Sequence, residues 1–155
     1  MEQPVVIDDL APVTDTVFAL SDVLELEWFE TRKRRFTRAT LAGVALVLQL
    51  KDQNEWYHGE GLFFEGELIA VIRIKTCLTI QFTPLSITET ADFCYYIGNR
   101  HLPVYLGKDK TTFIAPYDGK LFEQLEYRYP NRIRLLNDRL VAENTIRNEI
   151  KNITR

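Results

Sequence analysis

The chain has 155 residues and a mass of 18.1 kDa, which suits one ordinary domain or two small ones. Hydrophobic residues make up 46% of the sequence and charged residues 26%, a globular composition that excludes global disorder. The formal net charge is −3, whereas proteins that neutralise phosphates are usually basic. We therefore expect no nucleic-acid partner.

The first residues, Met1-Glu2-Gln3-Pro4, carry no early positive charge and no apolar run, so they do not form a secretory signal. The apolar run at residues 41–50 is far shorter than the roughly 20 residues that a spanning helix needs. Cys77 and Cys94 are too few to build a disulfide framework. These features predict a cytoplasmic protein with reduced thiols and no membrane partner.

The first half of the chain is β-like. Leu24, Leu26 and Trp28 alternate with acidic residues, which is the period of a half-buried strand. Two strand-like runs, residues 35–40 and 44–50, flank a glycine-containing turn and predict a hairpin. Before about residue 70 the pattern predicts no helix.

The second half changes to a helical period. Ser86 and Glu89 have the spacing of a capping box, and apolar residues then recur on one face. Gly98 is placed to end this helix in a left-handed conformation. A second helical pattern begins near Leu121 and ends at Pro130.

Strand patterns surround these helices at residues 74–82, 102–106 and 111–115, with a last strand from Ile133. The order is strand, helix, strand, strand, helix, strand, which is the split βαβ or ferredoxin-like pattern. We therefore predict an α+β protein with a β-rich N-terminal domain and a ferredoxin-like (βαββαβ) C-terminal domain.

The expected boundaries are residues 1–72 for the β-rich domain, 73–140 for the ferredoxin-like domain and 141–155 for a polar tail. The tail pattern is compatible with a short helix or with a frayed end.

The chain has two histidines, and their surroundings differ. His58 lies among loop-forming residues, so a solvated loop position is the simpler interpretation. His101 follows the predicted end of a helix and precedes a strand, which predicts an exposed side chain on a rigid support. A neutral imidazole is a good ligand for Ni, Cu or Zn. A lone exposed histidine more often has no ligand role, but a two-fold dimer would supply two imidazoles.

The neighbours of His101 suggest structural roles. Arg100 could anchor the loop or a carboxylate in the dimer, and Asn99 tolerates left-handed torsions. Tyr96 and Ile97 are expected to line a dimer contact, from their place on the helix alone.

Other motifs favour structural interpretations. Arg32-Lys33-Arg34-Arg35, with Arg38, is more simply a solvated strand face than a docking surface for an acidic partner. Gly59-Glu60-Gly61 lacks the third glycine of a dinucleotide fingerprint and predicts a turn. Cys77 and Cys94 are expected to pack in the core. No phosphate cradle and no nucleophile–histidine motif is present, so we predict no enzyme activity.

The segment Cys94-Tyr95-Tyr96-Ile97-Gly98-Asn99-Arg100-His101-Leu102-Pro103-Val104 resembles the UreE family of urease accessory proteins. The family shows there a helix that ends in Gly-Asn-Arg-His before a strand. Trp28-Phe29-Glu30-Thr31-Arg32-Lys33-Arg34-Arg35 is similar to the start of its N-terminal β domain. Gly66-Glu67-Leu68-Ile69 resembles the turn before its domain junction.

This resemblance implies an N-terminal domain for protein contacts and a homodimer formed through the C-terminal domains. It implies that His101 of each chain meets its mate near the two-fold axis and that the pair holds one Ni²⁺ per dimer. Zn²⁺ or Cu²⁺ would substitute in vitro. It also implies a metallochaperone that delivers nickel to the urease apoprotein complex through the urease accessory GTPase.

Three departures from the family pattern limit the ligand set. Residues 115–119 contain no histidine, Tyr96 stands where histidine is frequent, and residues 141–155 contain none. Low nickel storage is therefore expected, and further ligands would be water, Asp, Glu or Asn, or residues from a neighbouring dimer. The alternative function is a protein-interaction module of the urease maturation complex with little metal duty.

Overall fold

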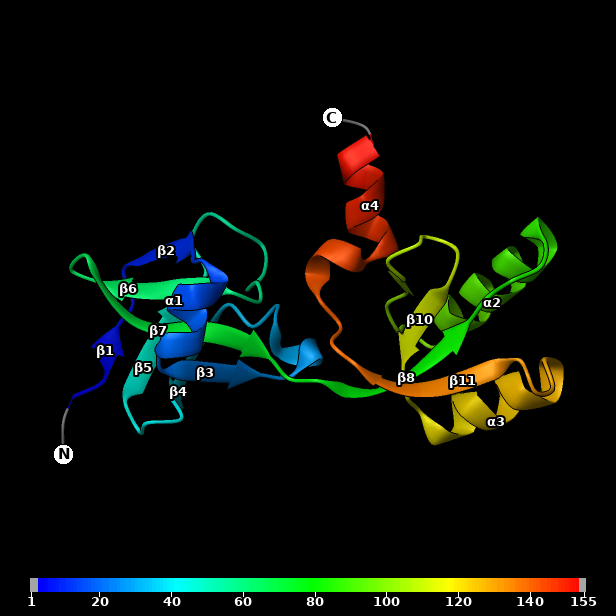
Figure 1. Cartoon of the computed structure of the whole chain (residues 1–155), viewed down its shortest axis with the longest axis horizontal. Coiled ribbons are helices and arrows are strands. Elements are labelled where there is room, and N and C mark those ends of the chain that lie inside the picture. Colours follow the sequence, from blue (N-terminus) through cyan, green and yellow to red (C-terminus); the bar gives the residue numbers. More distant parts are fainter. Residues whose placement is uncertain (1–2, 154–155) are drawn as a thin grey trace. The chain divides into compact units, whose positions relative to one another are not determined.

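The computed structural model describes residues 3–153 and divides into two compact units, one up to Lys75 and one from Thr76 onward (Figure 1). The predicted α+β class is confirmed, because strands predominate and helices occur in both units. The predicted domain boundary between residues 72 and 73 falls inside β7 (Glu67–Ile74). None of the described helices is long and apolar enough to cross a bilayer.

Unit 1 contains two sheets. The first has the order β1 (Val5–Val6), β5 (Ala45–Gln49) and β4 (Arg35–Ala39), and the second has the order β2 (Asp9–Pro12), β6 (Glu60–Phe64), β7 and β3 (Val23–Leu26). The predicted hairpin is confirmed: β4 and β5 pair antiparallel, and Gly43 has a φ of 91° in their turn.

One apolar core holds the two sheets together. Alternate residues of a strand point to the same face, so each strand contributes every second side chain to this core. Leu46 and Leu48 of β5 are fully buried, and Trp56 donates its indole N–H to the carbonyl of Lys33 at 2.8 Å. Other fully buried members are Leu24, Leu26, Leu62, Ala70 and Ile72.

The prediction of no helix before residue 70 is wrong. Asp15–Leu20 forms α1, and Thr14 caps it because its hydroxyl accepts the N–H of Val17 at 3.3 Å. This six-residue helix buries none of its residues, so it has no apolar period to detect. The strand predicted to include Trp28 ends at Leu26, and Trp28–Glu30 forms the 3-10 helix η1.

Unit 2 has the predicted order of elements. These are β8 (Cys77–Phe82), α2 (Ile87–Asn99), β9 (Tyr105–Leu106), β10 (Phe113–Pro116), α3 (Gly119–Arg128) and β11 (Ile133–Asp138). All sheet pairs are antiparallel, in the strand order β11-β8-β10-β9.

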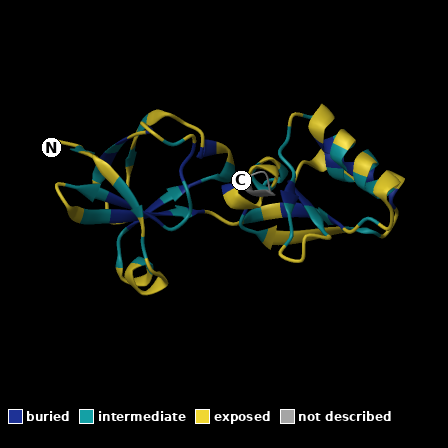
Figure 2. Cartoon of the chain, turned by 90° about the horizontal axis from the view of Figure 1, so that it is seen from above, coloured by how far each residue is buried: buried dark blue, intermediate teal, exposed yellow. Residues whose placement is uncertain are grey.

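The helices α2 and α3 pack against one core. Ile80 and Phe82 of β8 contact a cluster that includes Phe93 of α2 and Leu121 and Leu125 of α3. In Figure 2, buried residues run through the strands, and exposed residues cover the loops and outer turns. The tail forms the 3-10 helix η2 (Ala142–Asn144) and α4 (Ile146–Ile153). A bridge from Tyr105 to Thr145 joins it to β9.

Candidate metal centre

The start of α2 is built as the sequence predicts, with one difference. The hydroxyl of Ser86 accepts the N–H of Glu89 at 3.1 Å. The carboxylate of Glu89 accepts the N–H of Leu85 at 2.7 Å instead of the N–H of Ser86. It also forms a two-bond pair with Arg132, at 2.6 and 2.7 Å, and this pair is the main reason why the pKa of Glu89 falls to about 2. These bonds tie the start of α2 to the start of β11.

The inward face of α2 fixes its position. Phe93 and Ile97 are fully buried, so the prediction that Ile97 lines a dimer contact is wrong. Tyr96 is half-buried, and the guanidinium of Arg128 lies 5.1 Å from its ring centre. The outward side of the same helix carries Ile87 and Tyr95, which are exposed.

The end of α2 is a Schellman turn. The N–H of Leu102 donates to the carbonyl of Ile97 at 3.4 Å, and the N–H of His101 donates to the carbonyl of Gly98 at 2.9 Å. His101 therefore occupies the left-handed position of the motif, with a φ of 57°. Leu102 and Ile97 pack in the same core, which is the apolar contact that accompanies this turn.

Two predictions for this turn are corrected. Gly98 does not end the helix, because α2 continues to Asn99 and Gly98 has no positive φ. The left-handed conformation also does not fall on Asn99. It falls on His101, because the bonded turn closes two residues beyond Asn99.

Arg100 anchors the turn to α3, as the sequence suggested. Its guanidinium donates to the side-chain oxygen of Gln124 and lies 3.8 Å from a carboxylate oxygen of Asp118. Asp118 also caps α3, since its Oδ1 accepts the N–H of Leu121 at 2.8 Å. The turn at the end of α2 is therefore tied to α3.

The imidazole of His101 is exposed, as predicted. Within residues 3–153, no hydrogen bond or ion pair involves its ring. No group of three or more His, Cys, Asp or Glu side chains in this part of the chain could hold a metal ion. Among the described residues, His101 therefore presents an exposed imidazole on an anchored turn.

Comparison with known proteins identifies the family, although no family model matches the chain. The urease accessory protein UreE of Helicobacter pylori strain Shi470 is 34% identical over 120 residues, covering 76% of this chain and 68% of the relative. The chain belongs to the UreE family of urease accessory proteins. UreE of Helicobacter acinonychis strain Sheeba is 36% identical over 107 residues, which are 68% of this chain and 63% of the relative. UreE of Flavobacterium johnsoniae is 31% identical over 105 residues, which are 67% and 62%.

His58 has a structural position in this UreE family member. The sequence predicts a solvated loop, but the ring is half-buried, and its Nδ1 accepts the N–H of Ile74 at 3.1 Å. The ring centre lies 5.2 Å from that of Phe18. One ring nitrogen is therefore committed to holding β7.

The two cysteines are free and half-buried. Cys77 lies in β8 and Cys94 in α2, as predicted, although neither is fully enclosed. Burial raises the pKa of the Cys94 thiol, so this side chain stays protonated and is a poor metal ligand.

The basic run splits into two parts. Arg32, Lys33, Arg34 and Arg35 are exposed, which is the solvated face that the sequence favours. Arg38 points inward instead, and its guanidinium makes two bonds to the carboxylate of Glu30.

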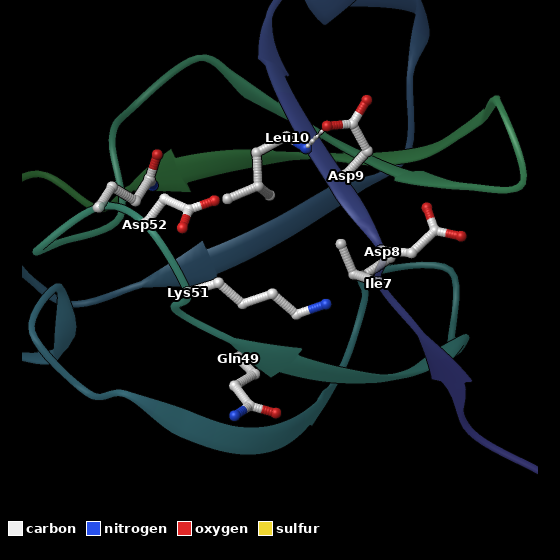
Figure 3. A pocket seen from close by; sticks show the side chains of 8 residues that line it. Ile7, Asp8, Asp9, Leu10, Gln49, Lys51 and Asp52 are labelled. Atoms are coloured by element: carbon white, nitrogen blue, oxygen red, sulfur yellow. Dashed lines mark hydrogen bonds between the residues drawn. The ribbon is translucent and has the colours of Figure 1, made fainter.

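A polar hollow in unit 1 contains no group of three or more His, Cys, Asp or Glu side chains that could hold a metal ion, among the described residues. Its lining includes Asp8, Asp9, Lys51 and Asp52, and Figure 3 shows the ammonium of Lys51 extending toward the segment with Asp8. Asp8 accepts the N–H of Glu65 at 3.1 Å, and Asp9 accepts the N–H of Leu10 at 2.9 Å. The carboxylates of Asp8 and Asp9 therefore accept backbone N–H groups, and Lys51 lines the same hollow.

The sequence predicted the exposed position of His101 but not the residues that anchor its turn. Asp118 and Gln124 lie 17 and 23 residues further along the chain, and their contacts with Arg100 arise only from the fold. The sequence could have indicated Asp118 as the N-cap of the second helix, because Asp is a preferred residue directly before a helix.

Proposed function

We propose that this UreE family member is a nickel metallochaperone, a carrier without catalytic turnover. It binds Ni²⁺ as cargo and delivers it during assembly of the urease metallocentre. Family membership supports the link to urease. The observation that carries the nickel role is the exposed, unpartnered imidazole of His101 on an anchored turn.

A single imidazole is a weak site, and the described residues form no group of three or more His, Cys, Asp or Glu side chains that could hold a metal ion. We therefore propose a homodimer through the C-terminal unit, in which two His101 rings hold one Ni²⁺ per dimer. Water or carboxylate oxygens complete the shell. Such a site keeps exchangeable positions for the ligands of a recipient, whereas a closed thiolate site would retain the metal. Zn²⁺ or Cu²⁺ would substitute in vitro, since affinity follows the order of the divalent series.

The architecture supports a division of labour. The strand order β11-β8-β10-β9 with two helices supports a ferredoxin-like fold for residues 73–140, with metal-binding and dimerisation roles. Residues 1–72 would serve protein contacts, and 141–155 form a polar tail. The proposed partners are the urease accessory GTPase and the urease apoprotein complex, in the cytoplasm. The net charge of −3 supports a role without nucleic acid.

Calorimetric titration of Ni²⁺ tests this function. The wild type should bind 0.5 Ni²⁺ per chain, and His101→Gly, which suits the left-handed backbone, should lose the tight phase. His58→Asn is the matched control, because the amide oxygen of Asn can accept the N–H that Nδ1 accepts from Ile74. Unchanged tight binding by His101→Gly would remove His101 from the site.

A second candidate function is a protein-interaction module of the urease maturation complex with little metal duty. It is favoured by the exposed cations at Arg34 and Arg35 and by the absence of histidine in residues 141–155. Under this alternative, Arg34→Glu/Arg35→Glu abolishes urease activation in cells while His101→Gly preserves it. The opposite pattern supports the carrier.

A further inference from the structure

A hollow on the sheet of unit 2 has only polar side chains in its described lining. Its volume is about 260 Å³, and it is lined by Gln81, Thr83, Thr112, Arg132 and Arg134. This volume is smaller than the roughly 300–1,000 Å³ of pockets for drug-sized ligands, so the hollow suits a small group. Two guanidiniums and no described carboxylate line it, so its charge favours an anion.

The strand register explains why these five side chains meet. Gln81 of β8 lies directly opposite Arg134 of β11. Thr83 follows β8 and Arg132 precedes β11, each two residues from its neighbour in the hollow. Opposed residues of paired strands share one face of a sheet, and so do residues two apart along a strand. Thr112 precedes β10 and joins the group, because its hydroxyl lies 2.9 Å from that of Thr83.

The hollow lies on the face of the sheet that α2 and α3 do not cover. Ile80 and Phe82 of β8 pack in the core with both helices. Gln81 lies between these two residues in the strand, so its side chain points to the opposite face. A ligand can therefore reach the hollow without displacing the apolar core of unit 2.

The two arginines differ in the partners that they already have. Arg132 forms the two-bond pair with Glu89 and donates to the carbonyl of Thr83 at 3.3 Å. Arg134 is exposed, and no hydrogen bond or ion pair involves its guanidinium within residues 3–153. A guanidinium presents five N–H donors in a planar fork that matches the oxygens of phosphate or carboxylate. Arg134 therefore supplies the charge that an anion would neutralise.

A hydroxyl donor stands beside this charge. The bond between the hydroxyls of Thr83 and Thr112 uses one of their two protons, so the other proton remains available for a ligand. The nearby carboxylates already have partners. Glu89 is paired with Arg132, and Asp138 accepts the N–H of Arg139 at 2.8 Å.

We propose that this hollow binds a phosphate group, held by the guanidinium of Arg134 and by the threonine hydroxyls. A tetrahedral phosphate directs its oxygens several ways, so it can accept bonds from β11 and from the threonines together. A planar carboxylate is already satisfied by a guanidinium fork alone. Because Arg134 is exposed, the affinity for a single phosphate should be millimolar, since solvent weakens ion pairs at a surface.

This site goes beyond the proposed function, because it requires neither Ni²⁺ nor His101. The group recognised is a phosphate with free oxygens, and either inorganic phosphate or a nucleotide can supply it. In both cases the same donors bind the same oxygens. A nucleotide would add contacts outside the hollow.

NMR titration of the full-length, metal-free protein with sodium phosphate tests the site at constant ionic strength and neutral pH. The backbone amides of Thr83 and Thr112 and the Nε–H of Arg134 should shift along one saturable curve. Sodium chloride should not produce this curve. Shifts of equal size with chloride would reduce the effect to charge screening and overturn the proposal.

Arg134→Gln should weaken phosphate binding about tenfold, because it removes a charge-assisted bond. It should also leave the unfolding midpoint unchanged, since Arg134 has no bonded partner among the described residues. Arg35→Gln is the matched control, because Arg35 is an equally exposed strand arginine in unit 1 and should leave the phosphate curve unchanged. Unchanged phosphate binding by Arg134→Gln would overturn the site.

Further ligands identify the source of the phosphate. Equal affinities for inorganic phosphate and adenosine monophosphate would support a site that reads the phosphate group alone, and tighter binding of the nucleotide would support a nucleotide ligand. Adenosine should not bind, and acetate should bind more weakly than phosphate. Binding of adenosine, or acetate binding as tightly as phosphate, would contradict the proposal. His101→Gly should keep phosphate binding while it loses Ni²⁺, so the failure of either proposal can be recognised separately.

Discussion

The N–H of Leu102 donates to the carbonyl of Ile97, and the turn that this bond closes holds His101 at a φ of 57°. Helices most often place glycine at this position, because a Cβ atom strains the left-handed conformation. The bonds of the turn come from the backbone, and its apolar contact comes from Leu102 and Ile97. None of these contacts of the turn involves the imidazole of His101, whereas the proposed carrier role requires that ring.

The first prediction follows from this strain. His101→Gly should raise the free energy of unfolding by about 0.5–1 kcal/mol, because glycine removes the cost of a Cβ in the left-handed region. Denaturant unfolding with tryptophan fluorescence and far-UV circular dichroism would measure the change. The same variant should lose tight Ni²⁺ binding.

His101→Val provides the opposite control, since a β-branched residue is a genuine outlier at positive φ. This variant should destabilise the protein. Because it also removes the imidazole, a loss of metal binding in this variant alone would not show whether misfolding or the missing ligand is the cause. A lower stability of His101→Gly than of the wild type would argue against the left-handed turn.

The second prediction concerns Gly98, which lies inside α2 with no positive φ. A Cβ atom built at this position meets nothing within 4 Å. Gly98→Ala should therefore stabilise the protein by about 0.5–1 kcal/mol, the helix propensity gain of alanine over glycine. Gly43→Ala is the control. A Cβ atom at Gly43 also meets nothing within 4 Å, but the φ of Gly43 is 91°, so this substitution should destabilise the protein. A loss of stability in Gly98→Ala would favour the sequence-based assignment of Gly98 as the helix end.

The difference between sequence and structure at this turn has a physical cause. Sequence patterns located α2 and both strands of the hairpin, because their apolar periods report which face is buried. They placed the left-handed residue at Gly98 or Asn99, since propensity favours Gly and Asn there. The position is instead set by the apolar contact of Leu102, which is tertiary. α1 escaped detection because none of its residues is buried.

The candidate site shows the same division. The exposed imidazole of His101 could be predicted from its place between a helix and a strand. The anchoring of Arg100 by Gln124 and Asp118 could not, because these residues meet only when α3 packs beside the turn. His58 was misjudged for the same reason: its loop composition says nothing of the N–H of Ile74 that it accepts.

The third prediction concerns acid stability and rests on the pair of Glu30 and Arg38. The carboxylate of Glu30 is buried, and the hydrogen bonds from Arg38 are the main reason why its pKa falls from 4.5 to about 2. Because the folded-state pKa lies below the unfolded value, this group stabilises the fold fully above pH 4.5, and the contribution disappears as the pH falls toward 2. The linked free energy is about 3 kcal/mol.

Denaturant unfolding at pH 7, 4.5, 3 and 2 would check this window. Arg38→Met should remove most of the stabilisation at pH 7, because it leaves the buried carboxylate with Lys33 as its remaining cation, at 3.2 Å. Arg32→Met is the control: Arg32 is 62% exposed and 4.0 Å from Glu55, so the change should cost at most about 0.5 kcal/mol. Equal effects of the two variants would show that burial of Glu30 does not matter.

The fourth prediction separates two roles of Asp118. Its Oδ1 accepts the N–H of Leu121 at 2.8 Å, which caps α3, and the carboxylate lies 3.8 Å from the guanidinium of Arg100. Asp118→Ala should destabilise the protein by about 1 kcal/mol, the usual cost of losing an N-cap. Asp118→Asn keeps a capping oxygen but no charge, so it should recover nearly all of that stability, because a long, half-exposed ion pair contributes little. Thermal and denaturant unfolding of both variants would measure the split. If Asp118→Asn were as unstable as Asp118→Ala, the pair with Arg100 rather than the cap would be the contact that holds the start of α3.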